Sequence, residues 1–214
     1  MKTVDQIFEA NKIVPVVVID DIDAAIPLAE TLLSAGIDSV EITLRTPNAL
    51  SIISTISKNI PQMLVGAGTV KTAADFFSAC VSGAKFIFSP GCTNELFEAA
   101  RSRYNDVRFM PGLVTPSHIM ESISRGFNYA KFFPAEPFNA YSVLKAMASP
   151  FPEIKFCPTG GITPENMAKY LELPNVFAVG MSSIVDAKLI AAHDFTEIRR
   201  RCEDAVKLVN SVIV

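Results

Sequence analysis

Sequence patterns for zinc binding and dithiol chemistry are missing from this chain. It has no tryptophan, no Cys-x-x-Cys pair and only two histidines, His118 and His193. Its four cysteines stand far apart, at Cys80, Cys92, Cys157 and Cys202. Zinc and redox sites need closely spaced ligands, so we assign no metal and no cofactor and interpret both histidines as solvated helix residues. Unpaired thiols are typical of a reducing compartment, which favours a cytoplasmic location.

Long apolar runs and strong charge are absent as well. No stretch reaches the roughly 18 apolar residues of a membrane-spanning helix, and the N-terminal sequence MKTVDQIFEANK lacks a signal-peptide pattern. The net charge of -3, with 19% of residues charged, provides no basic surface for a nucleic acid. We therefore expect neither a nucleic-acid nor a membrane partner. With 214 residues, 50% of them hydrophobic, the chain is predicted to form one globular domain over 1–214.

Short apolar segments rich in β-branched residues alternate with longer amphipathic segments. This alternation is typical of repeated strand-helix units and not of hairpins. The predicted strands fall in eight segments, 13–19, 39–44, 64–69, 86–91, 108–113, 129–135, 154–161 and 176–183.

The segments between these strands carry signals for helix starts and ends. Residues suited to cap a helix precede the amphipathic patterns at Asp21, Thr72, Thr93, Thr115 and Thr163. First-turn prolines follow the last two of these residues. Glycines suited to a left-handed C-terminal cap follow three of the patterns, at Gly36, Gly83 and Gly126.

Eight strand-helix units in one chain of this length predict an α/β fold, a single (β/α)8 barrel of the TIM type. An extra N-terminal helix at about residues 3–11 is expected at the bottom of the barrel. An open doubly wound sheet is disfavoured because no G-x-G-x-x-G follows the first strand. Polar, glycine-rich and proline-rich residues cluster at the carboxyl ends of the predicted strands, where barrels of this type carry their active sites.

A lysine interrupts the apolar stretch YAKFFPAE, residues 129–136. Side chains alternate across a strand, so Lys131 is expected to face the barrel interior while Ala130 and Phe132 face the helices. The same alternation turns Glu41 and Arg45 inward, which predicts three charges in one cavity. A mutually satisfied ion network is the alternative to a catalytic site.

An amine, a carboxylate and a guanidinium together suit imine chemistry. A lysine with its ordinary pKa of about 10.4 is almost fully protonated at neutral pH, so it attacks a ketone only when that pKa is lowered. We expect burial against Phe132 and Phe133 and the nearby charge of Arg45 to lower the pKa of Lys131. Arg45 also suits a substrate carboxylate, and Glu41 suits proton transfer.

The stretch PTGGIT, residues 158–163, predicts an anion site. A Thr-Gly-Gly turn between a strand and a helix presents backbone N–H groups to a phosphate, and the loop GMSS after the eighth strand is placed to complete it. A simple tight turn is the alternative interpretation.

Five of these motifs resemble the 2-keto-3-deoxy-6-phosphogluconate (KDPG) aldolase family, some members of which also act on 4-hydroxy-2-oxoglutarate. They are VEITLRT (40–46), GAGTV (66–70), SPG (89–91), KFFPAE (131–136) and FCPTGGI (156–162). The resemblance implies a trimeric barrel of the Entner-Doudoroff pathway that cleaves a 2-keto acid to pyruvate and an aldehyde without a metal. It implies Lys131 as the Schiff-base lysine, Glu41 as general acid/base and Arg45 as carboxylate partner. It further implies substrate contacts at Thr69, Pro90, Phe133, Thr159, Gly160, Gly161 and Ser182.

Two segments depart from the family pattern. The family commonly has Gly-Gly-Ser-Trp after the eighth strand, whereas this chain has Gly180, Met181, Ser182 and Ser183. We expect Met181 to add a side chain beside the phosphate pocket. The glycine pair that often follows FFPAE is replaced by PFNAYS, residues 137–142.

Two other functions fit parts of the same sequence. A phosphosugar isomerase or epimerase on a similar barrel needs an acid/base pair but no central lysine. A non-catalytic barrel that binds a phosphorylated ligand needs the PTGG turn but not Glu41.

Overall fold

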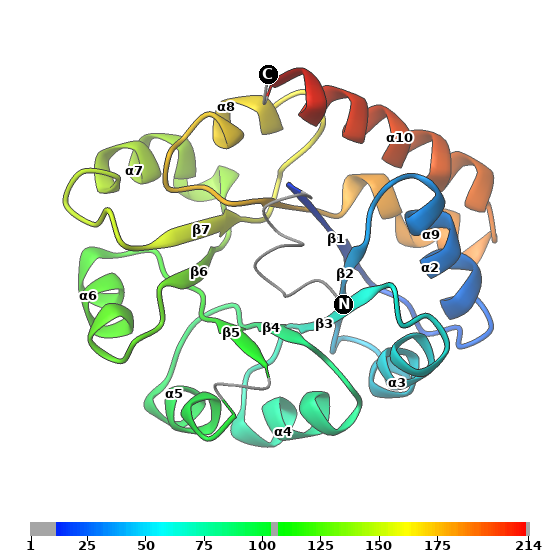
Figure 1. Ribbon diagram of the computed structural model, residues 1–214, viewed down its shortest axis with the longest axis horizontal. Coiled ribbons are helices and arrows are strands. Elements are labelled where there is room, and N and C mark those ends of the chain that lie inside the picture. The colour runs from blue at the N-terminus through cyan, green and yellow to red at the C-terminus, as the bar shows by residue number, and fades with distance from the viewer. Residues whose placement is uncertain (1–11, 104–106, 213–214) are drawn as a thin grey trace.

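A computed structural model describes residues 12–103 and 107–212 of the chain. Within these residues, parallel strands alternate with helices from β1 to β8, and the helices lie outside the curled sheet (Figure 1). This confirms the α/β class. The extra N-terminal helix predicted at about 3–11 lies outside the described residues.

The described strands are short and buried, and each corresponds to one predicted segment. Their bounds are β1 Ile13–Val17, β2 Ser39–Thr43, β3 Leu64–Gly68, β4 Phe86–Phe88, β5 Arg108–Met110, β6 Tyr129–Phe132, β7 Lys155–Pro158 and β8 Val179–Met181.

The helices follow the strands in turn. The α-helices are α2 Ala25–Ser34, α3 Ala49–Asn59, α4 Ala73–Val81, α5 Asn94–Arg101, α6 Pro116–Ser124, α7 Ala140–Met147, α8 Met167–Leu171, α9 Ala187–Ala191 and α10 Phe195–Val212. Two short 3-10 helices also follow strands, η1 Glu136–Phe138 after β6 and η2 Ser183–Val185 after β8. None of the described helices has the length and apolar character needed to cross a membrane.

The strands pair in parallel as two hydrogen-bonded groups. Six form a sheet in the order β5-β4-β3-β2-β1-β8, and β6 pairs with β7. Isolated bridges join Gly112 to Lys131 and Thr159 to Gly180, next to the two gaps between these groups. All the strands therefore point their carboxyl ends toward one side of the molecule.

Alternation along the strands separates two apolar clusters. Ile87 belongs to a large outer cluster between strands and helices, whereas its neighbours Phe86 and Phe88 belong to a small inner cluster. Ala130 and Phe132 likewise lie in the outer cluster, as the sequence predicts. Lys131, which lies between Ala130 and Phe132 in sequence, therefore faces the inside of the curled sheet.

Three of the predicted helix starts are confirmed. The side chains of Thr72, Thr93 and Thr115 each accept a hydrogen bond from the backbone N–H three residues later. The predicted caps Gly36, Gly83 and Gly126 have φ of 86°, 97° and 86°, the left-handed region that favours glycine.

The helix starts predicted at Asp21 and Thr163 are wrong. The Asp21 carboxylate accepts a hydrogen bond from the N–H of Asp23 in a turn, and α2 begins only at Ala25. The N–H of Thr163 donates to the side chain of Asn166, and α8 begins after that turn. In both places a local side-chain turn competes with the first helical turn.

The two histidines are exposed, but only His118 lies in a helix, the first turn of α6. The prediction of a helical position is wrong for His193, which lies in the turn before α10 with φ of 54°. Its Nε2 lies 2.8 Å from Asp21 Oδ2, so this pair links that turn to the loop after β1.

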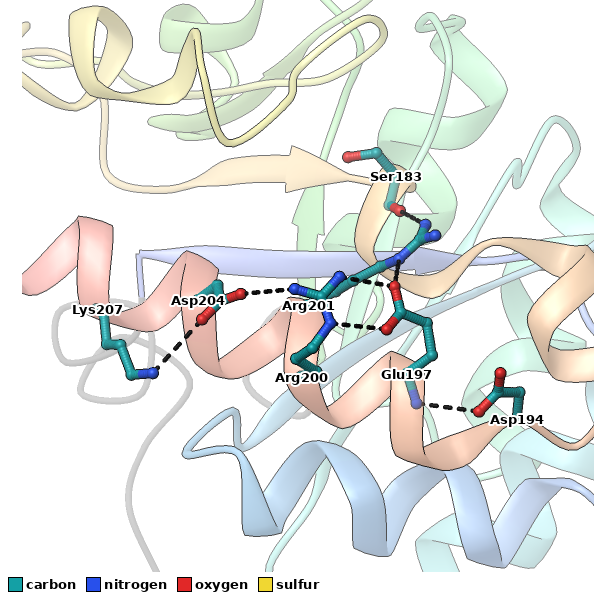
Figure 2. A network of polar contacts seen from close by, with 7 residues as sticks. All are labelled: Ser183, Asp194, Glu197, Arg200, Arg201, Asp204 and Lys207. Carbon is teal, nitrogen blue, oxygen red and sulfur yellow. Dashed lines mark hydrogen bonds and ion pairs between the residues drawn. The ribbon is translucent and has the colours of Figure 1, made fainter.

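A network of ion pairs fixes α10 against the segment after β8 (Figure 2). Glu197 accepts hydrogen bonds from Arg200 Nε at 2.7 Å and Arg201 Nε at 2.8 Å. Arg201 Nη1 also donates to the carbonyl oxygen of Ser183 at 3.2 Å. The hydrogen bonds from Arg200 and Arg201 lower the pKa of Glu197 from 4.5 to about 2.

The pH dependence of stability tests this network. A depressed folded-state pKa contributes stability that is complete above the unfolded pKa and is lost as pH falls through the folded pKa. The Tm difference between wild type and Glu197→Gln should be constant above about pH 5.5 and shrink between pH 4.5 and about 2. Glu172→Gln, an exposed carboxylate outside the network, is the control. A Tm difference that does not change over this range would contradict the assignment.

Candidate active site

Lys131 and Glu41 meet inside the curled sheet. Lys131 lies on β6 and is 4% exposed, and Glu41 lies on β2 and is fully buried. Lys131 Nζ donates to Glu41 Oε1 at 3.0 Å and lies 3.4 Å from Oε2. An amine and a carboxylate in direct contact, away from water, can exchange a proton within the site.

Aromatic rings enclose the amine. Lys131 Nζ lies 5.1 Å from the ring centroid of Phe88 and 5.6 Å from that of Phe133. The expectation that Phe132 shields the amine is wrong, because strand alternation turns Phe132 into the outer cluster, where it packs on Phe156. Phe88 takes that place and was missed, although its inward position follows from alternation along FIF at 86–88.

Two glycines of β3 make room for the interior side chains. A Cβ built on Gly68 would overlap the carboxylate of Glu41, and one built on Gly66 would overlap the ring of Phe86. In the β2–β3 register Glu41 pairs with Gly66 and Thr43 with Gly68, so both glycines lie beside the carboxylate strand. In the GAGTV motif, Gly68 thus leaves space for Glu41 and Gly66 for Phe86, a role that the sequence alone did not reveal.

Arg45 lies at the solvent-exposed end of β2 and not in the interior. The strand ends at Thr43, and the N–H of Arg45 donates to the carbonyl oxygen of Thr43 in a turn. Alternation therefore stops before Arg45, and the predicted cavity of three charges contains a buried pair with a guanidinium at its rim. Arg45 Nε donates to Thr69 Oγ1 at 3.1 Å, which fixes the direction of its side chain.

Thr69 has an unusual backbone conformation directly after β3. Its φ is 60°, a region that costs a β-branched residue roughly 1–3 kcal/mol. Strain of this kind persists only where surrounding contacts hold the residue, and here Thr69 accepts the hydrogen bond from Arg45. The conformation keeps Thr69 at the rim beside the guanidinium.

Pro90 is exposed just beyond the end of β4, and β5 lies between β4 and β6, the strand that carries Lys131. A Cβ on Gly112 would overlap the backbone carbonyl group of Pro90, so glycine there allows the two strand ends to approach. Gly112 donates to the carbonyl oxygen of Gly91 at 3.2 Å and forms the bridge to Lys131. Pro90 and Lys131 are therefore connected through a single intervening residue.

Thr159 and Cys157 occupy the interior on the other side of the lysine. Thr159 is 5% exposed, and its hydroxyl donates to the carbonyl oxygen of Cys157 at 3.3 Å. Burial raises the pKa of the Cys157 thiol to about 12, so it remains protonated and is not a nucleophile at neutral pH.

Gly160 and Gly161 form a turn with φ of 101° and 80°. In the described part of the chain, neither N–H group donates a hydrogen bond to another backbone or side-chain group. Ser182 is exposed at the end of β8, the neighbouring strand across the Thr159–Gly180 bridge. The turn and Ser182 provide free donors for an anion.

Met181 does not reach the predicted phosphate pocket, so that expectation is wrong. It is fully buried in the outer cluster, whereas a Cβ on its neighbour Gly180 would overlap Thr159 inside the sheet. Alternation along β8 accounts for this arrangement, because adjacent residues face opposite sides. The Gly-to-Met departure from the family pattern therefore changes the packing against the helices.

No group of three or more His, Cys, Asp or Glu side chains within 12–103 and 107–212 is arranged to hold a metal ion. The buried amine and carboxylate are the reactive groups around which the site is built.

Known proteins resemble this chain over almost its whole length. The family model "KDPG and KHG aldolase" matches residues 4–201. The 2-dehydro-3-deoxy-phosphogluconate aldolase of Pseudoalteromonas atlantica is 40% identical, covering 94% of this chain and 92% of that protein. The KHG/KDPG aldolase of Escherichia coli is 37% identical, covering 95% of this chain and 94% of that protein.

A solved structure agrees with these sequence relationships. The KDPG aldolase of Legionella pneumophila, crystallised with pyruvate captured as a covalent carbinolamine intermediate, superposes with a TM-score of 0.90 at 40% identity. The match covers 94% of this chain and 97% of that one. This chain therefore belongs to the KDPG and KHG aldolase family.

Proposed function

We propose that this protein is a class I aldolase that reversibly cleaves KDPG to pyruvate and glyceraldehyde 3-phosphate through a Schiff base on Lys131. We also propose that it cleaves 4-hydroxy-2-oxoglutarate (KHG) to pyruvate and glyoxylate. The observation that carries both proposals is the buried contact between Lys131 Nζ and Glu41 Oε1 at 3.0 Å. The names of the relatives and the covalent pyruvate adduct of the Legionella enzyme support the same chemistry.

The first stage forms the imine. Glu41 accepts a proton from Lys131, whose neutral nitrogen attacks the keto carbon of the substrate to give a carbinolamine. Glu41 then returns a proton to the carbinolamine hydroxyl, which leaves as water and produces the iminium ion. The enclosing rings of Phe88 and Phe133 limit competition from solvent water.

The second stage breaks the carbon-carbon bond. Glu41, directly or through a water molecule, accepts the proton of the C4 hydroxyl, and the electrons of the C3–C4 bond move into the iminium to give an enamine and a free aldehyde. Protonation of the enamine at C3 and hydrolysis of the imine release pyruvate and regenerate Lys131. One carboxylate beside the amine can serve each of these proton transfers.

The remaining site residues bind the two ends of the substrate. Arg45, oriented by Thr69, is placed to bind the carboxylate next to the keto group. Pro90 and Phe133 flank the pyruvate part of the substrate. Thr159 lies between this part and the phosphate, which would be bound at its far end by Gly160, Gly161 and Ser182.

The two other candidate functions leave the central contact unexplained. An isomerase or epimerase has no need of a buried lysine, and a non-catalytic binding protein has no need of the Glu41 carboxylate. A purely structural ion pair is also disfavoured. Burying two charges costs desolvation energy, so apolar residues of similar volume usually give equal or greater stability at such a position. Imine chemistry uses both members of the pair.

We further propose that residues 1–214 form one domain, a closed (β/α)8 barrel with an N-terminal helix. The bridges Gly112–Lys131 and Thr159–Gly180 support closure, because they join the six-stranded sheet to the β6–β7 pair on both sides. The free thiols of Cys92, Cys157 and Cys202 support a cytoplasmic location.

Covalent trapping tests the role of Lys131. Incubation with pyruvate and borohydride should yield a stable adduct that mass mapping locates on Lys131, because the imine is reduced to a secondary amine. Lys131→Met should show no adduct and lose at least about 10³-fold in kcat/KM. Lys145→Met, which removes an exposed lysine of α7, should retain both properties. Wild type that forms no adduct would exclude the Schiff-base mechanism.

Two variants test the carboxylate. Glu41→Gln should lower kcat by about 10²–10⁴-fold, the range for loss of a general acid/base. Gly68→Ala should also lower kcat while the carboxylate remains, because the added methyl group displaces Glu41. Gly91→Ala is the matched control, since a Cβ there meets no atom within 4 Å. Steady-state kinetics on KDPG are the measurement, and unchanged kcat in Glu41→Gln would assign proton transfer to another group.

We propose a homotrimer in solution. The family resemblance supports it, and large apolar side chains that remain exposed on the chain provide surface for an interface, among them Val81, Met120 and Phe138. Light scattering should return three times the 23.2 kDa mass of one chain. Charged substitution of Val81, Met120 or Phe138 should lower that mass if the side chain lies in the interface. A wild-type mass equal to one chain would exclude the trimer.

A further inference from the structure

Glu136 connects the segment after β6, the strand of Lys131, to helix α8. It lies five residues beyond Lys131 in YAKFFPAE, where η1 begins. Its carboxylate accepts a hydrogen bond from the Tyr170 hydroxyl and lies 3.3 Å from Lys169 Nζ. None of the substrate contacts proposed above includes this carboxylate, so its two partners on α8 need a different explanation.

The Gly160–Gly161 turn packs directly against this connection. The N–H of Glu136 donates to the carbonyl oxygen of Gly160 at 3.0 Å. A Cβ on Gly161 would lie 2.8 Å from Cβ of Glu136, and one on Gly160 would lie 3.4 Å from the ring of Phe133. The turn therefore packs on the Cβ and Cγ atoms of Glu136 and on the ring of Phe133, which also lies beside the amine of Lys131.

The opposite side of the turn is held from the loop before α8. Asn166 Nδ2 donates to the carbonyl oxygen of Gly161 at 2.9 Å, while its Oδ1 accepts from the N–H of Thr163. The carbonyl groups of the turn are thus engaged by protein donors on both sides. Its two N–H groups donate to no acceptor within residues 12–103 and 107–212, so they are available to an anion.

The hydrogen bond between Tyr170 and Glu136 is a strong one. Tyr170 is 1% exposed, and burial together with the hydrogen bond to Glu136 raises the pKa of its hydroxyl well above the usual value. The hydrogen bond from Tyr170 also lowers the pKa of Glu136. At neutral pH a neutral donor therefore faces an ionised acceptor, an arrangement stronger than a hydrogen bond between neutral groups.

We propose that the Glu136–Tyr170 pair is a positioning device that sets the Gly160–Gly161 turn relative to Lys131 and thereby favours a substrate with a terminal phosphate over a shorter keto diacid. This inference rests on the proposed aldolase function and adds the basis of substrate choice. Backbone donors bind a phosphate only at hydrogen-bond distance, so a small displacement of the turn weakens that contact.

Substrate length explains why the effect is selective. KDPG carries its phosphate on the oxygen of C6, whereas KHG ends in a carboxylate at C5, closer to the carbon attacked by Lys131. The shorter substrate therefore depends less on the position of the turn.

The experiment compares two substrates across a set of matched variants. Tyr170→Phe removes the donor and keeps the ring, Glu136→Ala removes the acceptor, and Glu136→Gln keeps an acceptor oxygen. The control is Glu121→Gln on α6, because Glu121 is 40% exposed and bound by Arg125 at 2.9 Å, similar to Glu136 at 38% exposure. KM and kcat are measured with KDPG and with KHG, and folding is checked by thermal unfolding.

Tyr170→Phe and Glu136→Ala should each raise KM for KDPG about tenfold, the effect of losing one charge-assisted hydrogen bond. KM for KHG, kcat and the rate of pyruvate trapping should change less than about twofold. Glu136→Gln should restore most of the KDPG affinity. The double variant Glu136→Ala/Tyr170→Phe should match the single variants, because both remove the same link.

The outcomes separate this inference from the proposed function. Wild type without activity on either substrate would overturn the aldolase assignment itself. Active wild type with variants that lose both substrates equally would show a purely structural role for the pair, and variants with unchanged KM for KDPG would show no role. Either of the last two results overturns the inference and leaves the aldolase intact.

Discussion

The contact between the Lys131 amine and the Glu41 carboxylate is the constraint on which the rest of the site depends. A charged or polar pair inside a protein is tolerated only when its members satisfy each other, and removal of one member typically costs about 3–5 kcal/mol. Here the two residues come from β6 and β2, which lie on different parts of the curled sheet. Their meeting requires the sheet to curl, so the same curvature that buries the core also builds the reactive centre.

Space and shielding around this pair come from residues without reactive groups. Gly68 leaves room for the carboxylate, and the rings of Phe88 and Phe133 lie beside the amine. Arg45 and Thr69 lie further out, where a strained backbone at Thr69 holds the guanidinium at the rim. The site therefore has an enclosed amine–carboxylate pair inside the curled sheet and an exposed guanidinium at the end of β2, the strand that carries Glu41.

The end of the site proposed to bind an anion is built in a different way, from backbone and not from buried charge. In the part of the chain that the structure describes, the N–H groups of the Gly160–Gly161 turn have no acceptor, whereas protein donors already bind its carbonyl oxygens. Glu136 follows β6, the strand of Lys131, and its N–H donates to the carbonyl oxygen of Gly160 in this turn. A direct hydrogen bond therefore links the two ends of the site. On the other side, Arg201 of α10 holds the backbone of Ser183 next to Ser182 (Figure 2). The Gly160–Gly161 turn is thus held through Glu136 by α8, and the loop after β8 is held by α10.

The sequence predicts features that depend on neighbours within a few residues. These are the strand positions, the opposite orientations of Lys131 and Phe132, and the helix caps at Thr72, Thr93 and Thr115. The rim position of Arg45 and the outward side chain of Met181 could not be predicted, since they depend on where β2 ends and how β8 faces. The sequence by itself determined which residue types stand at the strand ends. Alternation along the strands also predicted that Lys131 and Glu41 share one cavity. Only the tertiary structure decided that these residues, 90 positions apart, are in direct contact while Arg45 is not, because strand order and curvature bring distant segments together.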